Sequence, residues 1–221
     1  MKMILALIPL LFLGCAHPYS ISPISEKIEK LNGIELNTFT TKKCVLQAGY
    51  ETSTPEELLI HVRIMNKSES SFDIDSSYFN LSGAPESITD SPLTAQDPDR
   101  YLKELNTAAE LQDSRTQMES YQGIEALRTL KGPNSDRQID AASDQYKEKQ
   151  KDADKARKTA AALRKRAAMI APRVLKKTVL KSGESAEGAI IIRAAFKNEG
   201  AVTLESTHPA CQGTLRFLLR K

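Results

Sequence analysis

The sequence predicts an α+β protein in which an antiparallel β-sandwich carries a long inserted antiparallel α-helical hairpin. Two observations support this expectation. Short stretches of alternating apolar and polar residues, separated by turn-forming residues, occur before residue 97 and after residue 171, and they are typical of strands. Between them, residues 97–171 repeat their apolar residues at helical spacing. The hairpin is therefore expected to be an insertion in one loop of the sandwich.

The N-terminal segment predicts export. Lys2 is followed by an unbroken apolar run from Met3 to Leu13, which ends at Gly14 and Cys15. A permanent membrane-spanning helix needs about 20 apolar residues, so this run has the length of a signal-peptide core instead. Residues 1–14 are accordingly predicted to be a signal peptide that takes no part in the fold.

The end of this segment carries a motif. Phe12-Leu13-Gly14-Cys15 resembles the lipobox of bacterial lipoproteins, although Phe12 and Leu13 depart from its commonest residues. The resemblance implies that lipid, such as palmitate, is attached to Cys15 and holds the protein on a membrane of the cell envelope. Ala16 after the cysteine favours the outer membrane, facing the periplasm or the surface. An ordinary secretory signal cleaved near Ala16 and an uncleaved N-terminal anchor are the alternatives.

A tether is predicted over residues 15–32, which contain Pro18, Pro23 and several serines. Residues 33–96 are predicted to form the first part of the sandwich. Thr38–Gln47 is rich in β-forming residues, and Leu58–Met65 alternates strictly. One face of the latter strand would carry Leu58, Ile60, Val62 and Ile64, and the other Leu59, His61 and Arg63.

Residues 97–171 are predicted to form the helical hairpin. Asp97-Pro98-Asp99 is a favourable helix start, because proline and acidic residues suit the first turn. A broken apolar stripe follows, made by Leu102, Leu105, Ala109, Met118, Tyr121, Ile124 and Leu127. Lys131-Gly132-Pro133-Asn134 should end this helix.

The second helix has a clearer pattern. Ile139, Tyr146, Ala153, Ala160 and Ala167 recur every seven residues, with a companion series of Ala142, Lys149, Ala156, Leu163 and Ile170. These are the two core positions of a coiled coil, and alanine there allows two helix axes to approach closely. The two helices are therefore predicted to pack side by side, and Pro172 to end the second.

Residues 172–221 are predicted to complete the sandwich with strands in 174–180, 189–196, 201–204 and 214–219. Leu58–Asn66 and Thr178–Ile190, the latter with its Gly183-Glu184 turn, resemble the telokin-like, immunoglobulin-type domains of unknown function in bacterial surface lipoproteins. The likeness covers about half of the chain after Cys15. It implies an immunoglobulin-like antiparallel β-sandwich without catalytic residues, from which the inserted helical hairpin departs.

Two cysteines remain besides Cys15. Cys44 and Cys211 would lie in a compartment that permits disulfides, so a bridge between them is expected. Such a bridge would stabilise the fold by roughly 4–5 kcal/mol through loop closure. Two free buried thiols are the alternative.

The chain has no recognisable catalytic or metal-binding motif. His17, His61 and His208 lack partners at metal-ligand spacing, and no nucleophile motif or phosphate-binding glycine loop occurs. Asp73 and Asp75 share one face of a strand, a spacing that is common on exposed strands. We therefore expect neither an enzyme, nor a cofactor, nor a metal site.

Charge is distributed unevenly. Between Glu51 and Glu125 there are 15 acidic and five basic residues, whereas Lys147–Lys177 contains 12 basic and three acidic ones. Six residues of the second helix are candidates for a basic interaction face: Lys155, Arg157, Lys158, Arg164, Lys165 and Arg166. Charge pairing between the two helices is the alternative. An anionic lipid or envelope polymer is a candidate partner, whereas the lack of interleaved aromatic residues argues against nucleic acid.

Together these observations favour a non-enzymatic envelope lipoprotein that acts through its hairpin as a protein-interaction or structural module. Its partner would be another envelope protein or a second copy of the chain. A lipoprotein whose sandwich binds a glycan, a lipid or another anionic polymer is the alternative. The two differ in whether removing the hairpin removes the interaction.

Overall fold

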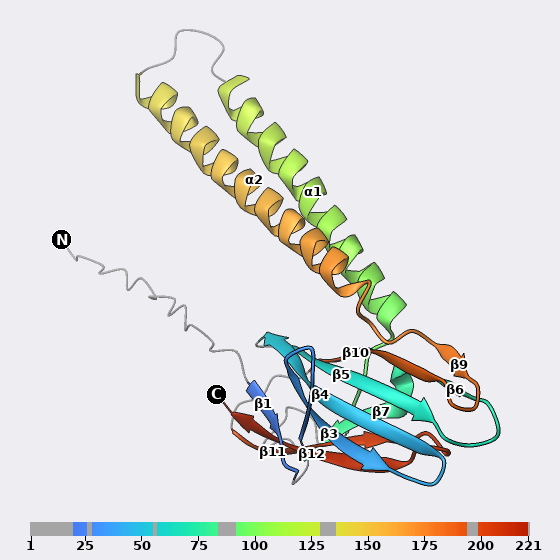
Figure 1. Ribbon diagram of the computed structural model, residues 1–221. Coiled ribbons are helices and arrows are strands. Elements are labelled where there is room, and N and C mark those ends of the chain that lie inside the picture. The colour runs from blue at the N-terminus through green and yellow to red at the C-terminus, as the bar shows by residue number, and fades with distance from the viewer. Residues whose placement is uncertain are drawn as a thin grey trace.

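The protein has a mixed α+β architecture (Figure 1). The computed structural model describes residues 20–25, 28–54, 57–83, 92–128, 136–193 and 199–220. The expected signal peptide over residues 1–14, the expected lipidation site Cys15 and His17 lie outside the described residues. Two antiparallel sheets form one body, and two long helices extend from it (Figure 1).

Each of the two larger sheets has five strands, and a short pair of strands forms a third sheet. The first has the order β1 (Ser20–Pro23), β12 (Gly213–Arg220), β11 (Gly200–Ser206), β7 (Phe79–Ser82), β8 (Leu93–Thr94). The second has the order β10 (Ser185–Arg193), β5 (Glu57–Asn66), β4 (Cys44–Thr54), β3 (Ile34–Thr40), β2 (Glu29–Leu31). The short pair is β6 (Phe72–Ile74) and β9 (Thr178–Leu180), and a 3-10 helix spans Ser76–Tyr78.

One hydrophobic core lies between the two larger sheets. The predicted inner face of β5 is confirmed, because Leu58, Ile60, Val62 and Ile64 are all buried in this core. Val202 and Phe217 reach the same core from the first sheet. Burial of such side chains is the main stabilising term of the fold.

The disulfide expected between Cys44 and Cys211 is present, with 5.5 Å between the two Cα atoms. Cys44 begins β4 of the second sheet, and Cys211 precedes β12 of the first. Both residues are fully buried in the core. The bond therefore connects the two sheets covalently across a sequence separation of 167 residues.

The first strands begin earlier in the chain than predicted. Ser20–Pro23, within the predicted tether, forms β1 and pairs with residues 217–220 of β12, and residues 29–31 form β2. Residues 38–47, which are rich in β-forming residues, belong to two strands, because the chain turns at residues 41–43 between β3 and β4. The Thr41 hydroxyl accepts hydrogen bonds from the Lys43 and Cys44 backbone amides and holds this turn.

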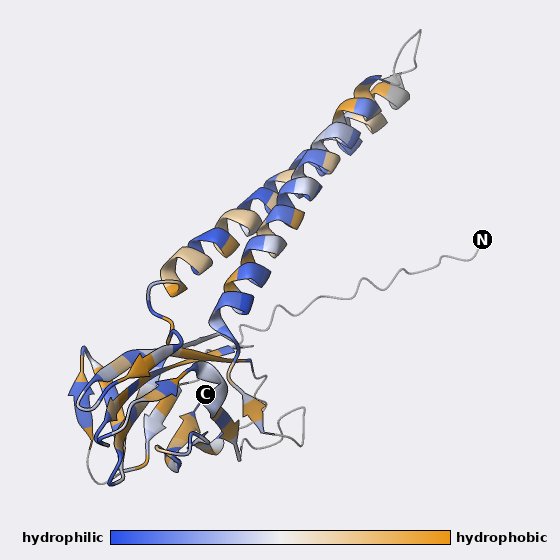
Figure 2. Ribbon diagram, turned by 90° about the vertical axis from the view of Figure 1, so that its right-hand side faces the viewer, coloured by the Kyte–Doolittle hydropathy of each residue, from blue (hydrophilic) through white to orange (hydrophobic). Residues whose placement is uncertain are grey.

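The hairpin consists of α1 (Pro98–Arg128) and α2 (Asp136–Ile170), which lie side by side and extend away from the sheets (Figure 1). The predicted start of α1 is confirmed: the Asp97 carboxylate accepts a hydrogen bond from the Arg100 backbone amide at 2.7 Å. With 31 and 35 residues the helices are roughly 50 Å long, at about 1.5 Å per residue. Hydrophobic turns recur among hydrophilic ones along both helices (Figure 2).

Both ends of the hairpin are hydrogen-bonded to strand β10, at the edge of the second sheet. Before α1, the Gln96 amide donates to the Ile191 carbonyl at 2.7 Å. After α2, the Leu175 amide donates to the Ala189 carbonyl at 2.9 Å. A Cβ atom on Gly188 would lie 2.6 Å from the Leu175 nitrogen, so this close approach requires glycine.

Candidate functional site

The base of the hairpin packs on the outer face of the second sheet. Leu59 of β5 and Ala189 and Ile191 of β10 point away from the main core and form a second hydrophobic cluster. The first turns of α1 supply Tyr101 and Leu105 to this cluster, and the last turns of α2 supply Ala167 and Ile170. Within the described residues, no side chain of the hairpin between Leu105 and Leu163 belongs to either cluster.

The heptad pattern predicted for α2 is confirmed as the seam against α1. Of its two series, Ala142, Ala153, Ala156, Ala160, Ala167 and Ile170 are buried, and only Ile139 near the distal end is exposed. Small side chains at these positions let the helices approach closely.

The apolar stripe predicted along α1 was wrong beyond its first turns. Leu105 and Ala109 are buried as expected, but the seam then continues through Thr116, Glu119 and Gly123. These residues keep the spacing of three and four, yet they are polar or small, and hydrophobic periodicity does not detect them. The Gly123 Cα lies so close to α2 that an added Cβ would be 3.3 Å from Lys149 Cβ.

Four residues of the predicted stripe are instead exposed to solvent, namely Met118, Tyr121, Ile124 and Leu127. Leu111, which the predicted stripe did not include, is exposed as well. Leu111, Met118 and Tyr121 are 65%, 52% and 62% exposed, and we call these three residues the outer stripe. Leu111 and Met118 are seven residues apart and Tyr121 follows three residues later, so they share the side of α1 opposite the seam. Ile124 continues the apolar surface at 46% exposure.

The polar part of the seam contains an ion pair. Lys149 Nζ of α2 lies 2.8 Å from Glu119 Oε2 of α1, with the Glu119 side chain only 8% exposed. The hydrogen bond to Glu119 raises the pKa of Lys149 above its usual value. Arg115 lies 3.8 Å from the other Glu119 oxygen. A pair of this kind fixes which turns of two helices face each other.

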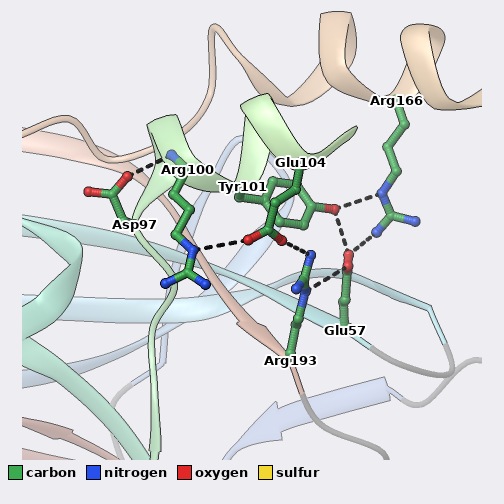
Figure 3. A network of polar contacts seen from close by, with 7 residues as sticks. All are labelled: Glu57, Asp97, Arg100, Tyr101, Glu104, Arg166 and Arg193. Carbon is green, nitrogen blue, oxygen red and sulfur yellow. Dashed lines mark hydrogen bonds and ion pairs between the residues drawn. The ribbon is translucent and has the colours of Figure 1, made fainter. Parts of the chain in front are cut away.

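A second polar network joins the hairpin base to the sheet (Figure 3). The Tyr101 hydroxyl donates a hydrogen bond to the Glu57 carboxylate at 2.7 Å and accepts one from Arg166 Nε at 3.0 Å. Arg166 also pairs directly with Glu57. Burial, reinforced by the bond to Glu57, raises the pKa of Tyr101 to about 12.

Arg193 extends this network to the outer side of α1. Its guanidinium lies 2.8 Å from Glu104 and 3.7 Å from Glu57, and it stacks over the Tyr101 ring at 5.4 Å (Figure 3). Glu104 also pairs with Arg100 one turn earlier at 3.0 Å. Hydrogen bonds from Arg100 and Arg193 lower the pKa of Glu104.

A pocket of about 440 Å³ lies beside this network, between the end of α2 and the end of β4; we call it the base pocket. Its apolar lining comes from Leu59, Ala162, Leu163, Met169 and Ile170. The polar residues of the lining are Thr52, Ser53, Thr54, Thr159, Arg166 and Arg173. Pockets of this size and mixed lining suit small molecules.

The six residues of the predicted basic face lie in different surroundings. Lys155, Lys158 and Lys165 are exposed, whereas Arg157 pairs with Asp154 at 2.8 Å and Arg164 pairs with Asp113 of α1. The Arg166 side chain is only 28% exposed and pairs with Glu57. The remaining exposed basic residues on this side are Lys151, Lys155, Lys158 and Lys165, which we call the lysine row. Among the described residues, none of these four forms an ion pair.

Of the two described histidines, His61 lies in β5 and His208 lies in the loop between β11 and β12. His61 Nδ1 lies 4.0 Å from the Glu51 carboxylate, and burial lowers the pKa of His61. His208 is enclosed by the rings of Phe72 and Tyr78, and burial lowers its pKa too. In the part of the chain that the structure describes, no three histidine, cysteine or acidic side chains are grouped as metal ligands.

Neither α1 nor α2, nor any other helix over the described ranges, has an apolar stretch that could span a bilayer. Comparisons of the chain with protein-family models, with curated proteins and with solved structures found no match.

Proposed function

We propose that this chain is a non-enzymatic lipoprotein of the bacterial cell envelope whose helical hairpin is a protein-interaction arm. Lipid on Cys15 would hold the protein on a membrane, most favourably the outer membrane. The two sheets would form an immunoglobulin-like, telokin-like sandwich that carries the arm. The observation that carries this proposal is the outer stripe, an apolar surface on the side of α1 that faces away from α2.

The proposed location in the cell envelope agrees with the disulfide bond between Cys44 and Cys211. A buried disulfide between Cys44 and Cys211 persists in oxidising surroundings, such as those outside the inner membrane of a bacterium. A cytoplasmic protein would keep these two thiols reduced. The signal-like segment over residues 1–14 and the disulfide therefore support export independently.

The arm is longer than the fold needs. Only its base contributes to the hydrophobic cluster on β5 and β10, through residues such as Tyr101 and Ile170. Farther out, the seam contains the Glu119–Lys149 pair and Thr116, which contribute less apolar burial than a leucine seam would. A long helix pair that adds little to the core supports a role in binding.

The outer stripe fits an amphipathic helix of another envelope protein. Leu111, Met118 and Tyr121 follow the spacing by which one helix packs along another. Methionine and tyrosine are also enriched in protein interfaces. A partner helix on this stripe would make the two-helix arm a three-helix assembly.

The test places a photo-cross-linking amino acid at Met118 in the full chain in its native envelope. The matched control places it at Val179 of β9, which is equally apolar and 62% exposed but lies on the sheets. We expect position 118 alone to give an adduct with one protein. Mass spectrometry should map the cross-linked peptide of that protein to an amphipathic helix.

A further variant carries Leu111→Gln and Tyr121→Gln together with the cross-linker at position 118. The proposal predicts that the adduct is lost, because the apolar contact on both sides of position 118 is removed. An unchanged adduct would contradict it. An adduct formed only with a second copy of the chain would replace the proposed partner by self-association.

A further inference from the structure

We propose that the base pocket binds a single-chain amphiphile with an anionic head group. This inference does not rest on the interaction arm, because the pocket lies at the base of the hairpin and the outer stripe lies farther along α1. Either site can exist without the other.

The apolar lining of the pocket matches a hydrocarbon chain. Leu163 and Ile170 come from the last turns of α2, and Leu59 comes from the outer face of β5. Met169 lines the pocket while 52% of its surface remains exposed, so about half of a large apolar side chain is open to solvent there. Burying this apolar surface against an acyl chain would favour binding.

The size of the pocket selects one chain. A volume of about 440 Å³ lies near the lower end of the range for small-molecule sites. It suits a single alkyl chain better than a two-chain lipid.

Two guanidinium groups at the pocket, each paired with one carboxylate, provide further N–H donors for the head group. The Arg173 side chain is 52% exposed and pairs with Glu51, whose own side chain is only 5% exposed. Because a guanidinium has five N–H groups, pairing with one buried carboxylate leaves Arg173 with further donors toward solvent. Arg166 likewise uses Nε for Tyr101 and Nη2 for Glu57, which leaves Nη1.

The surroundings of the pocket favour an anion over a cation. Lys158 and Lys165 of the lysine row are the sequence neighbours of Thr159 and Arg166, which line the pocket. Neither lysine forms an ion pair with another described residue. Thr52 and Thr54 also line the pocket, and a threonine hydroxyl can donate to a carboxylate or phosphate oxygen.

Photoaffinity labelling of the full chain in its native envelope tests the proposal. The probe is a fatty acid that carries a diazirine near the end of its chain, and the labelled peptides are identified by mass spectrometry. We expect saturable labelling of residues 159–173 and 52–59. Tetradecanoate and tetradecyl phosphate should compete, and their relative strength tells a carboxylate head from a phosphate head; tetradecyltrimethylammonium should not compete.

Neighbouring alanines provide a matched pair of variants. Ala162 and Ala161 are both exposed on α2, but only Ala162 lines the pocket. Ala162→Trp should fill the pocket and weaken labelling by at least about tenfold, which corresponds to ~1.4 kcal/mol of binding free energy. Ala161→Trp should leave labelling unchanged.

Met169→Trp and Ala168→Trp form a second pair two turns later, again with only the first lining the pocket. The denaturant midpoint of each variant shows whether it is folded. If Ala162→Trp is destabilised, this second pair still tests the pocket. The proposal would be overturned if labelling does not saturate, or if it persists in both filling variants while they are folded. It would also be overturned if the cationic amphiphile competes as well as the anionic ones. These outcomes leave the cross-link at Met118 unaffected, so failure here is distinguishable from failure of the interaction arm.

Discussion

Arg166 of α2 donates a hydrogen bond from Nε to the hydroxyl of Tyr101 on α1 at 3.0 Å, and both residues also contact the carboxylate of Glu57 at the start of β5. Three elements that are far apart in the sequence therefore meet at one carboxylate (Figure 3). The network fixes the direction in which the arm leaves the sheets, because it joins both helices to the same strand.

Replacing Arg166 should loosen this junction. Arg166→Met removes one partner of a Glu57 side chain that is only 12% exposed, and we expect the free energy of unfolding to fall by about 1–3 kcal/mol. The neighbouring Lys165→Met removes an exposed charge that has no ion-pair partner among the described residues, and it should change stability by less than about 0.5 kcal/mol. Urea unfolding measures both, and equal effects of the two variants would show that the network does not hold the base.

Tyr101 gives the base a measurable pH dependence. Its pKa is raised from 10.0 to about 12 in the folded protein, so the folded state retains the phenolic proton where the unfolded state loses it. This contribution to stability is fully present below pH 10 and is lost as the pH rises from 10 to about 12. Tyr101→Phe should abolish that part of the pH dependence, and absorbance of tyrosinate should show one group fewer titrating near 12. Loss of a group titrating near 10 instead would contradict the buried bond to Glu57.

The Glu119–Lys149 pair should determine which turns of α1 and α2 face each other more than it stabilises the fold. Lys149→Leu alone leaves a buried carboxylate with only Arg115 nearby, and the free energy of unfolding should fall by about 1–3 kcal/mol. Glu119→Leu combined with Lys149→Leu should restore it or raise it, because two apolar side chains fit a helix seam. Helical circular dichroism during urea unfolding compares the single and double variants. A double variant that is less stable than either single one would contradict this account.

The disulfide between the sheets should stabilise the whole domain. A bond that closes a loop of 167 residues contributes about 5 kcal/mol in the loop-entropy relation. The double variant Cys44→Ala with Cys211→Ala should therefore unfold at a much lower urea concentration. The same oxidised protein treated with a reductant should behave like the variant, and an unchanged midpoint in both would show that the bond carries no stability.

Some of this structure follows from local patterns and some does not. The alternation in Leu58–Met65 predicted which side chains enter the core, because a half-buried strand must alternate. The alanine heptads of α2 predicted its seam, because residues that recur every seven positions lie on one face of a helix. The seam of α1 could not be predicted, since its distal part is made by Thr116, Glu119 and Gly123 while the apolar residues face solvent.

Contacts between segments that are distant in the sequence could not be predicted from it either. The strand Ser20–Pro23 looks like a tether because its partner β12 lies at the other end of the chain. Arg166 looks like one more surface charge until the fold brings it to Glu57, 109 residues earlier. The base pocket has no sequence pattern at all, because it arises where α2 meets the end of β4.

The most direct measurement of the central claim replaces residues 111–158 with a short turn and leaves the base of both helices in place. The shortened chain keeps Tyr101, Leu105, Ala167 and Ile170, so its sheets should unfold at nearly the same urea concentration as those of the full chain. After chemical cross-linking in the native envelope, we expect it to lose the protein that cross-links to position 118 of the full chain. Undiminished recovery of that protein with the folded, shortened chain would contradict the role of the hairpin as an interaction arm.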